Sequence, residues 1–357
     1  AIDAKNRGAQ IEVQTECRSL KFLEDEKVWL VVLFNKLNSE LYEIKAQNVV
    51  NASGPWLNQF LTSAAPTLKP ARNIRLIKGS HIIVPRSPEL DQAYILQNED
   101  KRVVFVLPYL DKFSIIGTTD KEYQGKPEEV SIDDWEVDYL LKVYNQHFKT
   151  PLAWEDIVST YSGVRPLCDD ESNDPSAITR DYTLELHIES PKNALISIYG
   201  GKITTYRKLS EAVLAKLSPF ISKETQPWSA TQALPGSDSF GQTLTQIQSI
   251  LSQKFNWLNQ QQLNRYSKSY GLLCLTFLTG KKAHTELGQH FGADLFAAEI
   301  DYLIEHEWAN TAEDILWRRT KLGLFLTDTE KAEVQSYIEK KVFEQHSDNN
   351  KLYEQIA

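Results

Sequence analysis

The chain has 357 residues, enough for two or three domains with separate hydrophobic cores. With 41% hydrophobic and 24% charged residues, its composition is typical of a globular protein. The net charge of -9 argues against general nucleic-acid binding, which needs a basic face, but allows a pocket for a small anion. The three cysteines, Cys17, Cys168 and Cys274, are far apart and form no CxxC pair, which indicates a reducing compartment.

Strand patterns dominate the first part of the chain and helical patterns the last part. Residues 1–8 are expected to end a helix at Gly8. Alternating or continuous apolar runs predict strands at 9–16, 18–24, 28–35, 43–51, 74–85, 93–96, 103–109, 113–118, 157–164, 184–188 and 194–199. Apolar residues at helical spacing predict helices at 131–147, from about 202 to 217, and at 311–322. Thr327 and Glu330 form a capping box for the last helix.

Two segments, 49–56 and 196–207, run from an apolar strand through a glycine-containing turn into a helix. Such a junction presents free backbone N–H groups at the positive end of a helix dipole, where it can hold a pyrophosphate or the edge of a flavin. The same pattern is common in ordinary α/β connections. Lys202 follows Gly200 and Gly201 directly, so it is either a cation facing a ligand or a solvated lysine at a turn.

Arg165 lies between Gly163 and Pro166 after a strand. Its planar guanidinium suits a phosphate or carboxylate, although the local sequence slightly favours a structural ion pair with Asp169, Asp170 or Glu171. His81 lies inside an apolar strand, where it is either a hydrogen-bonded core residue or a proton acceptor at neutral pH. Residues 117–120 close a strand and are candidates for lining a pocket. The sequence contains no zinc-type cluster, GxGxxG or Walker A motif, so no metal is expected.

Taken together, these segments resemble the aerobic FAD-dependent glycerol-3-phosphate dehydrogenases, and the likeness covers nearly the whole chain in order. The residues that carry it are 74–81, 93–102, 117–120, 161–171, 177–182, 200–207 and 316–321. The resemblance implies oxidation of sn-glycerol 3-phosphate to dihydroxyacetone phosphate, with FAD as cofactor and a membrane quinone as electron acceptor. It also implies a cytoplasmic protein attached peripherally to the inner face of the cytoplasmic membrane, and it leaves a homodimer open.

By motif position, the resemblance assigns Arg165 to the substrate phosphate, His81 to the hydroxyl proton, and Lys202 to a place beside flavin and substrate. These three are the expected catalytic residues. The residues expected to contact FAD are Ala52, Ser53, Gly54, Gly163, Arg165, Gly201, Lys202, Ile203 and Thr204.

The expected fold is α/β (α+β), built around a partial FAD-binding domain of the glutathione-reductase and amino-acid-oxidase type. Its expected parts are the rest of the FAD-binding domain at 1–72, an antiparallel-sheet substrate domain at 73–156, a return segment of the FAD-binding domain at 157–217, and a helical C-terminal domain at 226–357. The family begins with a strand and a GxGxxG turn that hold the ADP half of FAD, and this chain has neither. By itself it is therefore expected to bind FAD weakly or not at all and to be inactive.

Three other functions remain open. A glycerol-phosphate oxidase would perform the same half-reaction with oxygen as acceptor. A non-catalytic module would use the substrate and helical domains for docking. An amine-oxidising flavoenzyme would use Arg165 and Lys202 to bind a carboxylate. For membrane contact, the cations at 318–321 next to the apolar residues at 322–326 are either a lipid-binding segment or a packed helix end.

Overall fold

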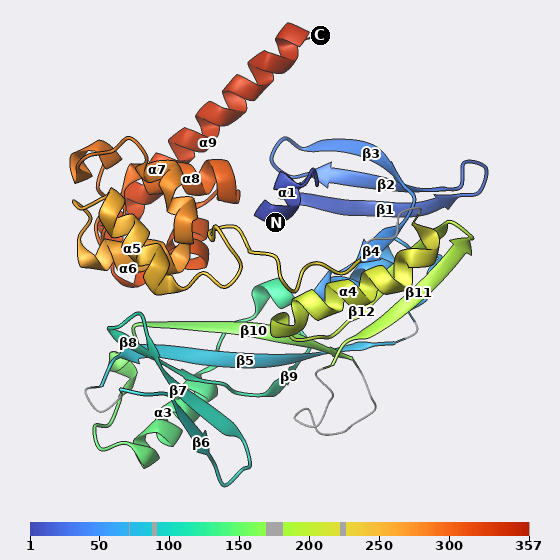
Figure 1. Cartoon of the computed structure of the whole chain (residues 1–357). Helices are drawn as coiled ribbons and strands as arrows, with labels where there is room; N and C mark the ends of the chain where they lie inside the picture. Colours follow the sequence, from blue (N-terminus) through green and yellow to red (C-terminus); the bar gives the residue numbers. More distant parts are fainter. Residues whose placement is uncertain (71, 88–90, 169–180, 222–225, 357) are drawn as a thin grey trace. The chain divides into compact units, whose positions relative to one another are not determined.

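The computed structural model describes residues 1–70, 72–87, 91–168, 181–221 and 226–356, with side chains described as far as Val342. The chain divides into two compact units. One consists of Ala1–Val13 together with Trp228–Ala357, and the other of Gln14–Pro227. The expected α/β architecture, with an antiparallel sheet and a helical C-terminal part, is confirmed (Figure 1).

The unit Gln14–Pro227 contains three sheets. A meander of antiparallel strands comprises β1 (Thr15–Leu23), β2 (Val28–Asn35) and β3 (Glu40–Ala46). A six-stranded antiparallel sheet has the order β10-β5-β8-β7-β6, with β9 paired to β5. Its strands are β5 (Ile74–Pro85), β6 (Tyr94–Gln97), β7 (Val103–Tyr109), β8 (Phe113–Gly117), β9 (Lys121–Tyr123) and β10 (Ser159–Cys168).

The third sheet contains β11 (Thr183–Ser190), β12 (Asn193–Tyr199) and β4 (Val49–Asn51). In it β12 runs parallel to β4 and antiparallel to β11. Strand β4 leads into η1 (Gly54–Trp56) and α2 (Leu57–Ser63), while β12 leads through η4 (Ile203–Thr205) into α4 (Tyr206–Leu217).

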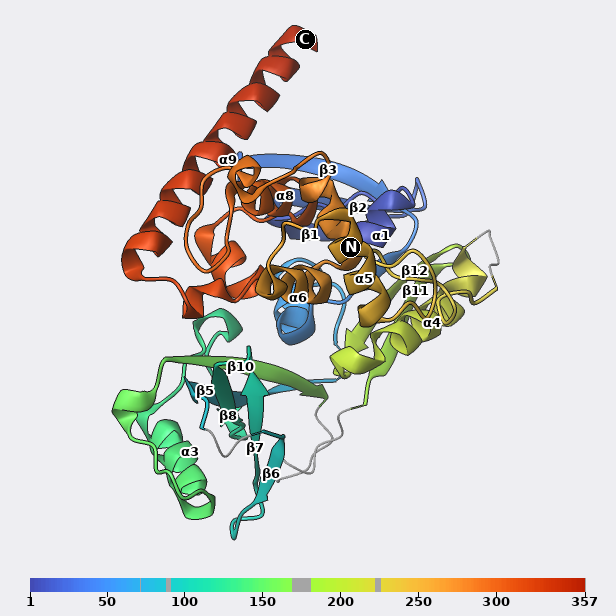
Figure 2. The same ribbon diagram turned by 60° about the vertical axis from the view of Figure 1, so that its left-hand side comes forward.

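Helix α3 (Asp134–His147) covers one face of the six-stranded sheet, as both ribbon views show (Figures 1 and 2). Apolar side chains of α3 and of the sheet form a shared core there: Ile82, Val84, Leu96, Val104, Val106, Ile116, Val137, Leu140, Leu141, Val143 and Tyr144. The opposite face remains open, because Ile95, Phe105 and Leu107 are exposed although they are apolar. A sheet with one covered face and one open face of apolar residues has room for a ligand on the open side.

The other unit is mainly helical. Its elements are α1 (Ile2–Asn6), α5 (Leu244–Lys254), α6 (Gln260–Ser269), α7 (Leu275–Leu278), α8 (Ala297–Glu307) and α9 (Asp328–Ile356). A core that includes Leu251, Tyr266 and Ile300 joins α5 to α9, whereas α1 has no buried residue. The expected capping box is present, because the Thr327 N–H donates to Glu330 Oε2 at 2.7 Å and the Glu330 N–H donates to Thr327 Oγ1 at 3.3 Å.

Several expected boundaries differ from the structure. Residues 9–14 form no strand, and the first strand begins at Thr15. Residues Ala1–Val13 group with the helical unit instead of with the segment 14–72. Strand β10 lies in the expected return segment but pairs along its length with β5 of the substrate-domain sheet. The helix expected at 311–322 ends at Arg319, because Leu322–Leu324 forms a separate 3-10 turn. Local apolar patterns do not reveal which distant strand or unit a segment joins.

Candidate active site on the open face of the six-stranded sheet

The alternation of side chains along β5 and β10 brings the expected site residues to one face. The two strands pair antiparallel, with Tyr161 opposite His81, Gly163 opposite Gly79, and Arg165 opposite Ile77. Because side chains two residues apart in a strand point to the same face, Tyr161, Gly163 and Arg165 lie beside His81. Lys78 and Ser80 point to the face that α3 covers. The expected neighbours Arg165 and His81 are therefore brought together.

Arg165 is held by the segment that follows β8. Its Nη1 donates to Asp120 Oδ1 in an ion pair, and its Nη2 donates to Thr118 Oγ1 at 3.3 Å. A methyl group on Gly79 of β5 would lie 2.9 Å from Arg165 Nη2. The guanidinium therefore lies over β5 at the position where glycine has no side chain. The Arg165 side chain keeps 32% of its surface exposed. The Arg165 guanidinium thus has a fixed orientation and is still partly exposed to solvent.

The alternative interpretation, that Arg165 forms a structural ion pair, is therefore correct in part, but the partner in the structure is Asp120. Asp120 is 45 residues away in the sequence. The three acidic residues expected as partners, Asp169, Asp170 and Glu171, lie outside the described residues. One carboxylate partner compensates the charge of Arg165 without using all five of its N–H donors.

His81 is enclosed between β10 and β8. Its ring stacks on Tyr161 with centroids 4.5 Å apart and planes inclined by 3°. A side chain at Gly117 would overlap the imidazole. Its Nδ1 is buried and has no hydrogen-bond partner among the described residues. Burial and the nearby Arg165 cation lower the pKa of His81 to about 4. The imidazole is therefore neutral at physiological pH, and a neutral imidazole can accept a proton.

The two strand–glycine–helix junctions lie next to each other because β4 and β12 are parallel neighbours, with Asn51 opposite Ser197. In the first junction, Asn51 Oδ1 accepts hydrogen bonds from the N–H and hydroxyl of Ser53. Asn51 Nδ2 is buried without a partner among the described residues, and a side chain at Gly54 would meet nothing within 4 Å. Ligands bind where the carboxyl ends of such strands meet.

The second junction contains Gly200 and Gly201, which have φ angles of 68° and 98° that favour glycine. A methyl group on Gly200 would lie 3.6 Å from the Pro166 carbonyl oxygen, so this turn contacts the residue that follows Arg165. Lys202, Ile203 and Thr204 are exposed beyond the turn. The Lys202 ammonium forms no ion pair with the described residues and makes no described contact with Arg165 or His81.

Tyr161, Thr118 and Asp120 were not assigned roles from the sequence. Tyr161 was detectable, because it lies four residues before Arg165 in a strand, and that spacing places both on one face. Thr118 and Asp120 belong to the segment that was expected to line a pocket, but their pairing with Arg165 depends on the order of the strands. The roles of His81, Arg165, Lys202 and the FAD-contacting residues remain predictions.

Within the described segments, no helix is both long and apolar enough to span a bilayer. Among the same residues, no group of three or more histidine, cysteine, aspartate or glutamate side chains could hold a metal ion.

Comparison with known proteins identifies relatives of both parts of the chain. Residues 1–207 match the family described as FAD dependent oxidoreductase, and residues 228–341 match the C-terminal domain of alpha-glycerophosphate oxidase. The chain is 46% identical over 339 residues to glycerol-3-phosphate dehydrogenase of Pseudomonas aeruginosa, which covers 95% of this chain and 65% of that protein. It is 38% identical over 332 residues to D-erythritol 1-phosphate dehydrogenase of Brucella abortus, which covers 93% of this chain and 65% of that protein.

A solved structure is similar to nearly the whole chain. It is the glycerol-3-phosphate dehydrogenase from Bacillus halodurans complexed with FAD, with a TM-score of 0.76 and 25% sequence identity. The match covers 96% of this chain and 71% of that one. The chain thus spans 65% of the length of the two relatives named above.

Proposed function

This chain belongs to the FAD dependent oxidoreductases, and we propose that the protein oxidises sn-glycerol 3-phosphate to dihydroxyacetone phosphate. The relative from Pseudomonas aeruginosa carries the name of this activity. The match of residues 228–341 to the C-terminal domain of alpha-glycerophosphate oxidase supports the same substrate. The single observation that carries the proposal is an oriented arginine beside a neutral, half-buried histidine on an open sheet face.

FAD, the cofactor of this family, fits the residues present. Asn51 Nδ2 has no partner among the described residues, and a side chain at Gly54 or at Gly163 of β10 would meet nothing within 4 Å, which leaves room for a polar ligand at the first junction and at this point of β10. The backbone of Ala52, Ser53, Gly54, Gly201, Ile203 and Thr204 would hold it, and Lys202, which forms no ion pair within the described part of the chain, would favour its anionic form. When bound, FAD supplies the acceptor for a hydride.

Arg165 would bind the substrate phosphate and so position the carbon that reacts. Its orientation by Asp120 and Thr118 leaves further N–H donors of the fork for phosphate oxygens. Binding at the unreactive end of a substrate lowers the entropic cost of aligning the reacting end. The phosphate dianion would also compensate the Arg165 cation, which contributes to the low pKa of His81.

His81 would accept the proton of the substrate hydroxyl. In the oxidation, the C–H bond of the secondary carbon breaks and its electron pair leaves as hydride. The O–H bond breaks, its proton moves to the imidazole, and the freed electron pair forms the second C–O bond of the ketone. The base must be neutral at the start, and His81 satisfies this condition because burial lowers its pKa.

A direct test compares Arg165→Lys with Arg102→Lys in the full-length, FAD-loaded protein. Arg102 is a matched control, because it also pairs with one carboxylate, Asp100, and its side chain is 33% exposed. Flavin reduction is followed without oxygen, with sn-glycerol 3-phosphate or D-erythritol 1-phosphate as substrate. We expect Arg165→Lys to raise KM at least tenfold, since lysine cannot form the bidentate contact, and Arg102→Lys to leave KM within twofold. A higher kcat/KM for D-erythritol 1-phosphate in the parent protein would overturn the choice of substrate.

We propose further that the electrons pass to a membrane quinone and that the protein docks peripherally on the cytoplasmic membrane. Such a dehydrogenase, unlike an oxidase, should react with oxygen more slowly than with a quinone. In the segment after α8, Arg318 pairs with Glu313 and Asp314, whereas Leu322 and Leu326 are buried in the helical core. These contacts favour a packed helix end over a lipid-binding segment at 318–326, so the docking proposal rests on the family resemblance. Reoxidation of the reduced protein by a soluble quinone, compared with oxygen, tests the acceptor, and flotation with liposomes tests the docking.

A further inference from the structure

A buried polar network lies on the covered face of the sheet, directly behind the candidate site. We propose that Thr119, Glu136 and Lys78 act as positioning residues that hold the segment Gly117–Asp120, and through it the guanidinium of Arg165. This inference deepens the proposed function and rests on it for the role of Arg165. It concerns the side of the sheet that faces α3, opposite to the candidate site.

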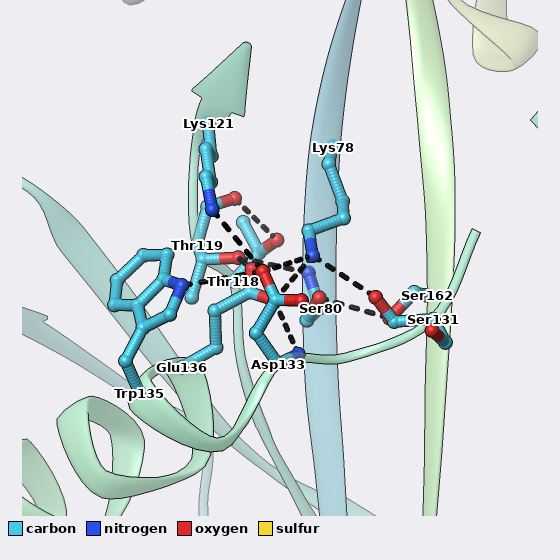
Figure 3. Close-up of polar contacts among 10 residues, drawn as sticks. All are labelled: Lys78, Ser80, Thr118, Thr119, Lys121, Ser131, Asp133, Trp135, Glu136 and Ser162. Atoms are coloured by element: carbon cyan, nitrogen blue, oxygen red, sulfur yellow. Dashed lines mark hydrogen bonds and ion pairs between the residues drawn. The ribbon is translucent and has the colours of Figure 1, made fainter. Parts of the chain in front are cut away.

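The centre of the network is an ion pair from which solvent is excluded (Figure 3). Lys78 Nζ lies 2.7 Å from Glu136 Oε2, with 3% and 0% of their side-chain surfaces exposed. Lys78 Nζ also donates to Asp133 Oδ2 at 2.8 Å and to the Ser131 carbonyl oxygen at 2.9 Å. The three acceptors match the three N–H groups of the ammonium. Lys78 is therefore fully used within the network and does not bind substrate.

Glu136 links the ion pair with Lys78 to the segment that follows β8. The Thr119 hydroxyl donates to Glu136 Oε1 at 2.6 Å and accepts from the Ser80 N–H at 3.0 Å. The other carboxylate oxygen of Glu136 accepts from the Asp133 N–H at 2.9 Å, which closes the capping box of α3. Thr119 thus joins strand β5, helix α3 and the segment after β8 at one point.

The same segment holds Arg165 from the open side. Thr118 and Asp120, the two neighbours of Thr119, both contact the Arg165 guanidinium. The Thr118 hydroxyl also donates to the Thr119 carbonyl oxygen at 2.9 Å. Thr119 itself is fully buried. Anchoring its side chain under the sheet therefore presents the two flanking side chains to the guanidinium above the sheet.

Stability alone is a weak reason for burying this ion pair. Taking two charges out of water costs several kcal/mol per ion, and well-packed apolar side chains in place of a buried pair are often neutral or stabilising. The core of Ile82, Val84, Ile116 and Val137 adjoins the network and would accept apolar neighbours. A charged pair, by contrast, has one preferred hydrogen-bond geometry, and such geometry keeps a remote group in a single orientation.

The test is a double-mutant cycle between Thr119→Val and Arg165→Gln in the full-length protein with FAD bound. Thr119→Val keeps the shape of the side chain but removes the hydroxyl that joins Glu136 and Ser80. We expect it to raise KM for sn-glycerol 3-phosphate at least tenfold and to change kcat less than threefold. In the Arg165→Gln background it should have no further effect on KM, and Thr119→Ser should restore the parent KM. Additive effects of the two substitutions would overturn the proposal, as would a lowered Tm with unchanged KM.

A control variant on the same helix separates positioning from general loosening of α3. Asp138→Asn makes the same carboxylate-to-amide change as Glu136→Gln, but Asp138 is exposed and accepts only from Trp154 Nε1 in the described contacts. We expect Glu136→Gln to raise KM and Asp138→Asn to leave it unchanged. Equal effects of the two variants would contradict a role of the network in placing Arg165.

A second measurement does not depend on the substrate. Arg165 contributes to the low pKa of His81, after burial. If Thr119→Val displaces the guanidinium, the pKa of His81 should rise, as it should in Arg165→Gln, and it should rise no further in the double variant. The pKa can be followed by NMR of the imidazole C–H. A parent protein that does not turn over sn-glycerol 3-phosphate would refute the proposed function, while an unchanged His81 pKa in Thr119→Val would refute the positioning network.

Discussion

Replacing Lys78 by methionine should reveal how strongly the network holds the six-stranded sheet. Lys78→Met keeps the length of the side chain but leaves the fully buried Glu136 carboxylate without its cation. Breaking a buried ion pair by removing one partner costs about 3–5 kcal/mol. Glu136 retains hydrogen bonds from the Thr119 hydroxyl and the Asp133 N–H, so the lower end of that range is expected. For a unit of this size, roughly 2–4 °C is lost per kcal/mol, which gives a decrease in Tm of about 6–12 °C.

The loss of stability in Lys78→Met should depend on pH in a defined direction. In the parent, burial raises the pKa of Glu136, but hydrogen bonds from Lys78 and Thr119 outweigh burial and lower it below the usual 4.5. The carboxylate therefore adds stability above pH 4.5, and this contribution is lost as the pH falls. In Lys78→Met, burial should prevail and raise the pKa of Glu136, so that stability falls as the pH rises above 4.5. The difference from the parent should be larger at pH 7 than at pH 5.

Thermal and urea unfolding, followed by circular dichroism at the two pH values, measure both effects. Lys121→Met is the matched control, because Lys121 pairs with Asp133 at 3.1 Å while 46% of its side chain is exposed. An exposed pair contributes about 0–1 kcal/mol, so this variant should unfold close to the parent. The reasoning fails if Lys78→Met lowers the free energy of unfolding no more than Lys121→Met does. It also fails if the loss of stability in Lys78→Met is not smaller at pH 5 than at pH 7.

Three further outcomes follow from the structure. His81→Asn should lower kcat by about 10²–10⁴-fold, as expected for loss of a general base. It should also abolish the decline of kcat/KM in acid near the His81 pKa of about 4, measured as a pH–rate profile. An unchanged profile would exclude His81 as the base. Gly117→Ala should lower kcat by about 100-fold, because the added methyl group overlaps the His81 imidazole and a small displacement of a reacting group lowers the rate by about this factor. An unchanged kcat with a normal Tm would contradict the enclosed position of His81. Thr327→Ala should cost about 1 kcal/mol by removing the N-cap of α9, measured by urea unfolding, with Thr327→Ser close to the parent.

Much of the local structure was predictable from the sequence. The hairpin of β7 and β8 was expected, because two apolar runs flank a three-residue loop, and the structure pairs them. The helix over 131–147 and the capping box of Thr327 and Glu330 were also expected, since both depend on residues three or four positions apart. Interactions of this kind are encoded within one turn of the chain, so a pattern in the sequence is sufficient to predict them.

The candidate site was predictable in its parts but not in its assembly. The sequence by itself identified His81, Arg165 and the two glycine-containing junctions as positions suited to a ligand. Only the tertiary structure showed that Asp120 pairs with Arg165, that Tyr161 stacks on His81, and that Lys78 is bound by Glu136 behind the sheet. These contacts join residues 45 to 80 positions apart or arise from the docking of α3 on the sheet. They depend on strand order and on which face a helix covers, and those are decided by packing of the whole core instead of by neighbouring residues.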